Sequence, residues 1–449
     1  RVTNARLVLP APHTAGAQAR LRQMLDDPAV QRAGGEGHRV VMGPGEPALS
    51  EWAAAGLTLP DLNALRHYRL GRIRQQLVAN DLAGVLLFDP LNLMYATDAP
   101  NMQLWVAHNQ ARWAYVAAEG PMILWEFNNC EFLSAHNPLI TEVRPITSFT
   151  YFLAGQRAEE QAARMAAEIA DLVQTYGGGN TRLAVDVTPP LGSAALINAG
   201  LTLTDGMQVM ERARAIKGPD ELLAMRCAIE ATRISCQKMF DALRPGISEQ
   251  ELWAVLWAEM LTRGGEWMEC RLLAAGARTN PWFQECSSHV ISEGELVGFD
   301  TDLVGSYGMM TDISRTWRCG GGDPTPQQNF VHQIAVEQME RNIELLTPGR
   351  SFYDLTHKSW VPSTDDYRHY SVLYHGVGQC DEWPSIMFPS SWDQFGYDGV
   401  LEPGMVMTVE SYVGPYAGGE GVKLENQVLI TETGYENLTP WSLSLTEFC

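Results

Sequence analysis

The stretch that decides the fold is "LEPGMVMTVESYVGPYAGGEGVKLENQVLIT", residues 401–431. Its two apolar runs are rich in valine, methionine and leucine, which predicts β-strands. Each run contains one glutamate, Glu410 in the first and Glu425 in the second. A carboxylate within an apolar strand is costly unless it is paired or bound to a cation. For a single residue, exposure at a strand end is the more ordinary explanation.

The same pattern recurs upstream of this stretch. "ELVGFDTDLVG", residues 295–305, places Asp300 and Asp302 on one face of a predicted strand, because side chains alternate along a strand. "GMMTDISRTW", residues 308–317, supplies Asp312, and "YHGVGQCDEWP", residues 374–384, supplies His375. Acidic residues therefore recur at the expected ends of several apolar strands, which a purely structural explanation does not account for.

Paired divalent cations account for this recurrence. Only two basic residues, Arg315 and Lys423, lie in the same segments. If the carboxylates converge, they cannot all be ionised together without compensation, and two divalent metal ions supply it. Oxygen ligands with one imidazole suit Mn, Fe, Co or Zn rather than a thiolate-type site.

Composition narrows the class of protein. The chain of 449 residues is longer than one core usually organises, so we expect two domains. It has no apolar run of membrane-spanning length and no signal-peptide pattern. The eight cysteines form no CxxC pair, which favours reduced thiols and a cytoplasmic location. A formal charge of -21 argues against nucleic-acid and membrane partners, although solubility alone also explains it.

The order of elements predicts three parts. Residues 1–64, rich in Ala, Gly and Pro, are expected to form an extension without an assigned fold. Residues 65–205 alternate predicted helices and strands, which indicates an α/β domain. Residues 206–449 open with a long helix that begins at Pro219 and stops at Pro245-Gly246. Here residues 243–252 resemble residues 346–355, which indicates either a duplicated helix pair or chance similarity of two helix stops.

The order Asp300, Asp312, His375, Glu410, Glu425 resembles the metal-ligand series of the creatinase/prolidase/methionine aminopeptidase superfamily, which has the pita-bread fold. "DISRTW", "LEPGMVMTVE" and "GVKLENQVLIT" resemble strand motifs of that superfamily, and "LFDPLNLMYATD" resembles a turn of its N-terminal domain. The resemblance implies an α/β (α+β) protein, with a creatinase-like N-terminal domain followed by a pseudo-symmetric pita-bread domain. It also implies two divalent metal ions. Asp300 stands slightly farther from Asp312 than in the peptidases, so Asp302 is a sixth candidate ligand.

One departure from the superfamily bears directly on function. Its H-E-x-P element, which opens with a catalytic histidine, is written here Asp381-Glu382-Trp383-Pro384. An imidazole can donate to a developing oxyanion, whereas an ionised carboxylate can only accept, so the change disfavours peptide hydrolysis. Burial near aromatic side chains would make Asp381 a useful base. The structural alternative is an aspartate satisfied by local backbone.

Aromatic residues complete the predicted site. Tyr370, Trp360, Tyr367 and Trp383 are candidate substrate-binding residues that can cage a cationic group, although core packing explains most such residues. A carboxylate base, a metal pair and such a cage describe a site for a small zwitterion.

This combination resembles the dimethylsulfoniopropionate lyases of the DddP type, a non-peptidase branch of the superfamily. The resemblance implies β-elimination to dimethyl sulfide and acrylate with Asp381 as base, iron as the metal, and a homodimer. Three alternatives remain open: an Xaa-Pro dipeptidase or aminopeptidase, a creatinase-like amidinohydrolase, and a catalytically inactive binding module.

Overall fold

The structure is a computed structural model that describes residues 6–8 and 40–449. Most of the predicted extension, residues 1–64, lies outside the described residues. By its contacts the chain divides into two units, Arg1–Gly43 with Pro60–Arg214 and Pro44–Leu59 with Ala215–Cys449. Residues 44–59, counted with the extension in the sequence analysis, therefore pack in the second unit, and the first unit runs to Arg214 rather than to residue 205.

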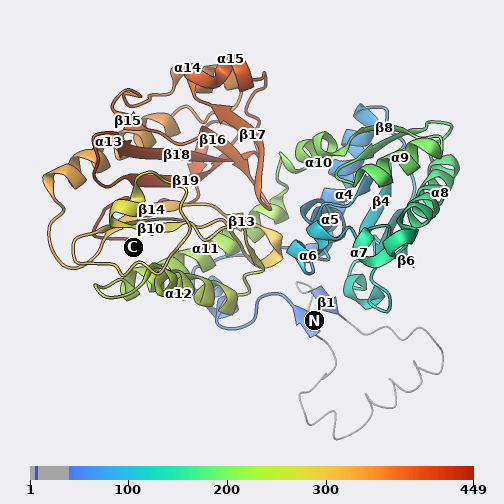
Figure 1. Ribbon diagram of the computed structural model, residues 1–449, viewed down its shortest axis with the longest axis horizontal. Helices are drawn as coiled ribbons and strands as arrows, with labels where there is room; N and C mark the ends of the chain where they lie inside the picture. Colours follow the sequence, from blue (N-terminus) through green and yellow to red (C-terminus); the bar gives the residue numbers. More distant parts are fainter. Residues whose placement is uncertain (1–5, 9–39) are drawn as a thin grey trace, which may run out of the picture. The chain divides into compact units, whose positions relative to one another are not determined.

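Unit 1 is an α/β domain (Figure 1). Its six-stranded mixed sheet has the order β6-β5-β4-β3-β7-β8. Apolar clusters cover both faces of this sheet, and Trp113 of β4 is fully buried against Trp125 of β5. The elements are β1 Arg6–Val8, β2 Val40–Met42, α4 Leu62–Ala79, β3 Gly84–Leu87, α5 Pro90–Thr97, α6 Gln103–His108, β4 Trp113–Ala117, β5 Met122–Glu126, β6 Glu142–Pro145, α7 Tyr151–Ala154, α8 Ala158–Tyr176, β7 Arg182–Val185, α9 Pro190–Asn198, β8 Thr202–Asp205 and α10 Gly206–Arg214.

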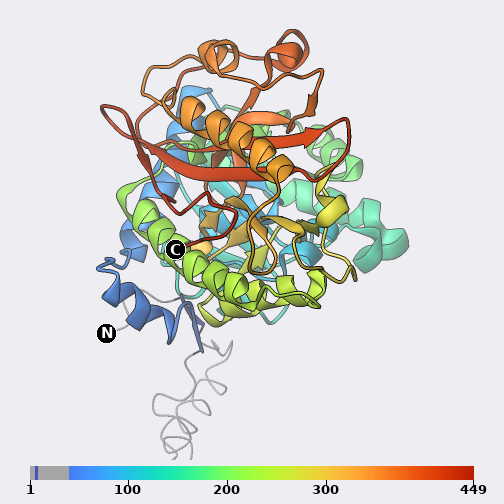
Figure 2. The ribbon, with the colours of Figure 1, turned by 90° about the vertical axis from the view of Figure 1, so that its left-hand side faces the viewer.

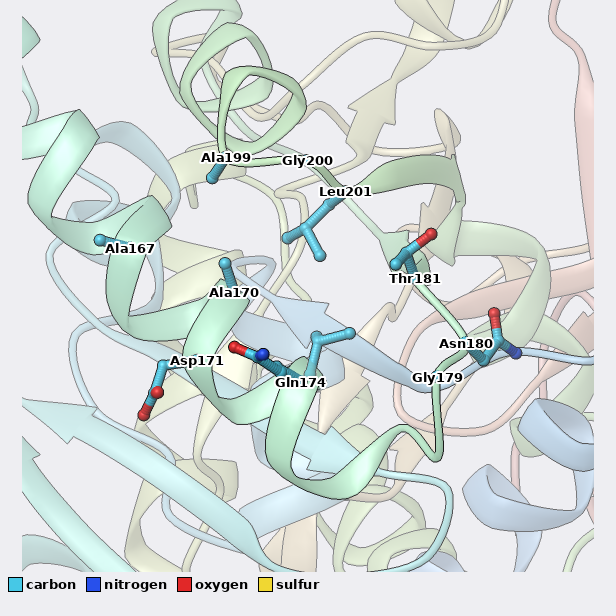
Figure 3. A pocket seen from close by; sticks show the side chains of 11 residues that line it. Ala167, Ala170, Asp171, Gln174, Gly179, Asn180, Thr181, Ala199, Gly200 and Leu201 are labelled. Atoms are coloured by element: carbon cyan, nitrogen blue, oxygen red, sulfur yellow. The ribbon is translucent and has the colours of Figure 1, made fainter.

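A hollow of about 640 Å³ lies on unit 1, beside α8 and the segments that lead into β7 and β8 (Figure 3). Its lining consists mostly of small or apolar residues such as Ala170, Gly179 and Gly200, and Asp171 is the one ionisable side chain among them. A hollow with a single carboxylate lacks the convergent polar groups that mark a reaction site, so the candidate chemistry lies in unit 2.

Unit 2 is built on an antiparallel sheet in the order β10-β11-β14-β19-β18-β16-β17, with β15 beside β18 and β20 beside β19. The elements are α3 Ala48–Ala54, α11 Pro219–Ala242, α12 Glu249–Thr262, β9 Trp267–Met268, β10 Leu273–Ala275, β11 Leu296–Asp300, β12 Leu303–Val304, β13 Met310–Thr311, β14 Ser314–Arg318, α13 Pro326–Ile343, α14 Phe352–Lys358, β15 Tyr367–Arg368, β16 Val372–Val377, β17 Asp381–Met387, α15 Trp392–Phe395, β18 Val406–Pro415, β19 Val422–Ile430 and β20 Tyr435–Asn437.

Backbone hydrogen bonds confirm the duplication inside unit 2. In the first copy Gly246 N donates to Ile291 O at 2.8 Å, and in the second Gly349 N donates to Leu401 O at 2.8 Å. Ser248 accepts from Glu251 N at the start of α12, and Ser351 caps α14 in the same way. The strand that follows carries Asp300 nine residues after Ile291 and Glu410 nine residues after Leu401 (300 − 291 and 410 − 401). The two copies therefore present equivalent carboxylates.

The long helices of unit 2 cover one face of its sheet, which leaves the other face for these carboxylates. Gln338 of α13 accepts a hydrogen bond from Ser411 at 2.7 Å, and α13 lies across β18 and β19 (Figure 2). Phe240 of α11 contacts Trp317 of β14, with ring centroids 5.0 Å apart. Since Ser411 points to the helices, its neighbour Glu410 points to the opposite face.

Two further observations bear on the class of protein. Within the described residues, no helix is both long enough and apolar enough to cross a bilayer. All eight cysteines lie in the described part of the chain, and each is a free thiol.

Candidate metal centre and active site

Neighbouring strands bring the predicted ligands together on the face of the unit 2 sheet that points away from the helices. Glu410 of β18 lies directly opposite Glu425 of β19, and Glu425 lies opposite Ser314 of β14. Asp300 is the last residue of β11, and Asp312 lies in the short link before β14. Glu410 and Glu425 thus lie within their strands, so the expectation that the acidic residues mark strand ends is wrong for these two.

Asp302 reaches the cluster by a different route from the predicted one. The strand ends at Asp300, and Asp302 lies in the turn beyond it with a φ of +37°, so the predicted shared strand face is wrong. The turn nevertheless brings the carboxylates of Asp300, Asp302 and Asp312 together, with one oxygen of each within 4.8 Å of the others. Cys270 fixes the carboxylate of Asp302, because its Sγ donates to Asp302 Oδ2 at 2.9 Å.

His375 is the centre of a second group, which it forms with Asp312 and Glu425. Its Nε2 lies 3.3 Å from Asp312 Oδ2, 3.2 Å from Glu410 Oε1 and 3.6 Å from Glu425 Oε1. Burial alone would lower the pKa of His375, but Asp381 and the surrounding carboxylates raise it well above its usual value. The two groups share Asp312, and Glu410 lies beside His375 and opposite Glu425. The structure therefore brings all six predicted ligands together.

Lys423 also contacts this cluster, although it was not predicted as a site residue. Its Nζ lies 2.9 Å from Glu410 Oε2, 3.1 Å from Glu425 Oε2 and 3.5 Å from Asp300 Oδ2, and the side chain is fully buried. Its ammonium also donates to Ser314 Oγ at 2.9 Å. The signal was the i, i+2 spacing of Lys423 and Glu425, which puts both on one strand face.

Several oxygens of the cluster are left for a cation. Asp300 Oδ1, Asp312 Oδ1 and Glu425 Oε1 are buried and have no hydrogen-bond partner among the described residues. Burial raises the pKa of Asp300 to about 7 although Lys423 opposes it, and burial also raises the pKa values of Asp302, Asp312 and Glu410. Orphaned buried oxygens and one imidazole form a donor set that fits divalent cations.

Glu425 differs from the other four carboxylates. Burial would raise the pKa of Glu425, but the Lys423 ammonium and His375 outweigh burial and hold it well below its usual value. Five carboxylates, those of Asp300, Asp302, Asp312, Glu410 and Glu425, thus meet here, and the Lys423 ammonium contacts three of them, Asp300, Glu410 and Glu425. Metal cations can balance the remaining charge, because a divalent ion is usually the largest local charge in such a site.

Asp381 lies at the edge of the cluster, at the start of β17. Its Oδ1 is 3.8 Å from His375 Nδ1, and its side chain is 56% exposed. The expectation that Asp381 is buried among aromatic side chains is therefore wrong. Its neighbour Glu382 turns inward instead, where it pairs with the buried Lys217 at 3.0 Å. Asp381 is thus the residue of this element that a substrate can reach.

A cavity of about 390 Å³ opens above the cluster. Tyr370 lines it, whereas the other three aromatic candidates are not among its lining residues. Trp383 packs on Phe352, Trp360 lies against Arg341, and Tyr367 packs on the core. Phe283, which no sequence pattern singled out, also lines the cavity. The lining residues are Glu269, Cys270, Leu272, Phe283, Glu285, Asp300, Asp302, Asp312, Tyr370, His375, Asp381 and Glu425.

Comparison with known proteins agrees with this geometry. The model of metallopeptidase family M24 matches residues 224–432. A protein of Roseovarius nubinhibens, named dimethylsulfoniopropionate lyase DddP, is 46% identical over 412 residues, which cover 90% of this chain and 92% of the relative. The protein of that name from Roseobacter denitrificans is 44% identical, with the same coverage.

Solved structures show the same fold. The Xaa-Pro dipeptidase from Bacillus anthracis superposes with a TM-score of 0.67 at 21% identity, covering 84% of this chain and 98% of the dipeptidase. At that level of identity the likeness concerns the fold alone, and the expected pita-bread architecture is confirmed.

Proposed function

Because this chain belongs to metallopeptidase family M24 and, within it, to the group of DddP lyases, we propose that it cleaves dimethylsulfoniopropionate to dimethyl sulfide and acrylate. The chain is a carbon–sulfur lyase on a metallopeptidase-like fold. The observation that carries this proposal is the carboxylate of Asp381 at the cavity wall, 3.8 Å from His375. In the peptidases that this chain resembles, the corresponding motif opens with a catalytic histidine.

The cluster would hold two divalent metal ions. When bound, these ions would hold the carboxylate of the substrate and acidify the C–H bond next to it. Iron is the metal that we favour, and manganese, cobalt or zinc suit the same donors. The residues that would hold the ions are Asp300, Asp302, Asp312, His375, Glu410 and Glu425.

Asp381 starts the elimination. Its carboxylate takes the proton from the carbon next to the substrate carboxylate, and the electron pair of that C–H bond forms the C=C bond of acrylate. The C–S bond breaks, and its electron pair leaves with neutral dimethyl sulfide. Because the Asp381 side chain is 56% exposed, it can then pass the proton to water and return to its ionised form.

The Xaa-Pro dipeptidase alternative has less support. A tetrahedral intermediate needs a donor for its oxyanion, and an ionised carboxylate at position 381 cannot donate. The remaining parts of the proposal, a homodimer in the cytoplasm, are supported by the family resemblance and by the free cysteines.

The test is an assay of both reactions on the same metal-loaded preparation. We expect dimethyl sulfide in the headspace and acrylate in solution in equal amounts from dimethylsulfoniopropionate, and no hydrolysis of Xaa-Pro dipeptides. Dipeptide turnover without dimethyl sulfide would reverse the assignment. Turnover of neither substrate by a protein with full metal content would point to an inactive binding module.

A further inference from the structure

The cavity contains an aromatic side chain, Phe283, that neither the metal centre nor the proton transfer uses. We propose that the ring of Phe283 contacts the sulfonium group of the substrate and determines the preference for a cationic over a neutral group. This inference rests on the proposed function, because it assigns the cationic end of the same substrate.

The ring lines the cavity and is exposed to solvent rather than packed in the core. Phe283 is 60% exposed, and its ring is stacked on Tyr370 with centroids 5.4 Å apart and planes 6° apart. Tyr370 also contacts the fully buried Lys423, whose Nζ lies 4.4 Å from the centroid of the tyrosine ring. Tyr370 therefore lies between a buried ammonium and an exposed phenyl ring, so Phe283 offers the accessible aromatic face.

The backbone of Phe283 is strained in a way that the surrounding loop enforces. Its φ of +75° is an unfavourable conformation for a bulky side chain, which persists only where neighbours fix it. Trp282 is 8% exposed, and a methyl group added at Gly298 would lie 3.0 Å from its ring. Gln284 Nε2 donates to the carbonyls of Arg278 and Pro281, both at 3.0 Å. The ring is thus pre-organised at the cavity.

The charges around the ring favour a cation. Asp381 and Glu285, whose side chains are 56% and 47% exposed, line the same cavity as Phe283. Glu285 is paired with Arg271 at 2.6 Å, and the exposed Glu269 lines the cavity together with Asp381, so the exposed charges of the lining are carboxylates. A cation within about 6 Å of an aromatic centroid gains about 0.5 to 2 kcal/mol, most when both are desolvated. The metal-binding cluster thus suits the carboxylate of a zwitterion, and the ring of Phe283 suits its cationic group.

The experiment compares two probes of one shape on the metal-loaded enzyme. 3-(Trimethylammonio)propionate carries the cation, and 4,4-dimethylpentanoate is its neutral isostere. The ratio of their dissociation constants, measured by calorimetry or by inhibition of dimethyl sulfide release, reports the preference for charge. We expect Phe283→Leu to reduce this ratio about 2- to 30-fold, as the range for cation–π contacts converts, and Phe283→Trp to keep or increase it.

Phe330→Leu is the matched control, because Phe330 of α13 is 57% exposed and does not line the cavity. It should leave the ratio unchanged. If Phe283→Leu weakens the binding of both probes equally, with metal content and circular dichroism unchanged, Phe283 is only an apolar wall and the inference is overturned. In that case dimethyl sulfide release by the unchanged enzyme still supports the proposed function. If the unchanged enzyme neither releases dimethyl sulfide nor binds either probe, both the proposed function and this inference are overturned.

Discussion

Replacing Lys423 by methionine should strongly destabilise the metal-free protein. The ammonium of Lys423 is fully buried and lies 2.9, 3.1 and 3.5 Å from oxygens of Glu410, Glu425 and Asp300. At an effective dielectric constant of about 20, each of these contacts is worth about 5 to 6 kcal/mol of Coulomb energy. Burying the ammonium cancels much of that sum, and removing one partner of a buried ion pair typically costs about 3 to 5 kcal/mol.

The measurement is thermal unfolding of chelator-treated protein at pH 8, where the carboxylates are most ionised. For a unit of this size the expected loss lowers the melting temperature by roughly 6 to 20 °C. Lys358→Met is the matched control, because Lys358 forms a surface pair with Asp354 at 2.8 Å with its side chain 54% exposed. Such a pair is worth at most about 1 kcal/mol.

Metal loading supplies the second half of this test. Divalent cations bound to the same carboxylates take over part of the compensation, so the gap between Lys423→Met and the unchanged protein should narrow when metal is added. A Lys423→Met variant that, without metal, unfolds within 2 °C of the Lys358→Met control would refute the electrostatic account of the cluster.

Three further predictions address the same site. Asp381→Asn should lower the rate of dimethyl sulfide release by at least about 100-fold while elemental analysis finds the metal content unchanged. Loss of metal would make Asp381 a ligand, and Asp393→Asn on the exposed α15 is the control. Cys270→Ala removes the donor to Asp302 and should weaken metal binding about 10-fold in a chelator competition, whereas Cys270→Ser should restore it; equal affinities in all three proteins would contradict this role. The metal-free protein should lose stability as pH rises from 5 to 8, because the raised pKa values of Asp300, at about 7, and of His375 mean that the folded state binds more protons there than the unfolded state. The lowered pKa of Glu425 affects stability only below that window. Each extra proton bound by the folded state lowers the free energy of unfolding by about 1.4 kcal/mol per pH unit. Urea titrations that show this free energy rising from pH 5 to pH 8 would contradict the prediction.

The parts of the site that follow from strand patterns were predictable. An acidic residue in an apolar run is visible in any sequence, and the energetic cost of burying it holds wherever the strand lies. The four carboxylates of Asp300, Asp312, Glu410 and Glu425 were therefore predictable as candidate ligands from this pattern, whereas His375 was added to them by the family resemblance. The duplication was visible as well, because helix stops and N-caps are local signals.

Other features depend on contacts between distant segments. Whether Asp302 continues a strand or enters a turn is decided by the pairing of β12 with β9 and β13, which the local sequence does not fix. Trp360, Tyr367, Tyr370 and Trp383 look alike in sequence, and packing alone selects Tyr370 for the cavity. Phe283 gave no sequence signal, since its exposure follows from a loop that Trp282 and Gln284 anchor.

The sequence by itself thus predicted which carboxylates need a compensating positive charge, because the cost of burying charge depends on residue type and pattern. Only the tertiary structure decided how they meet: that Lys423 supplies one of the positive charges, that Asp381 stays accessible, and that an exposed phenyl ring lines the cavity. These outcomes depend on which side chains from separate strands and loops share one volume, and that is set by packing of the whole unit.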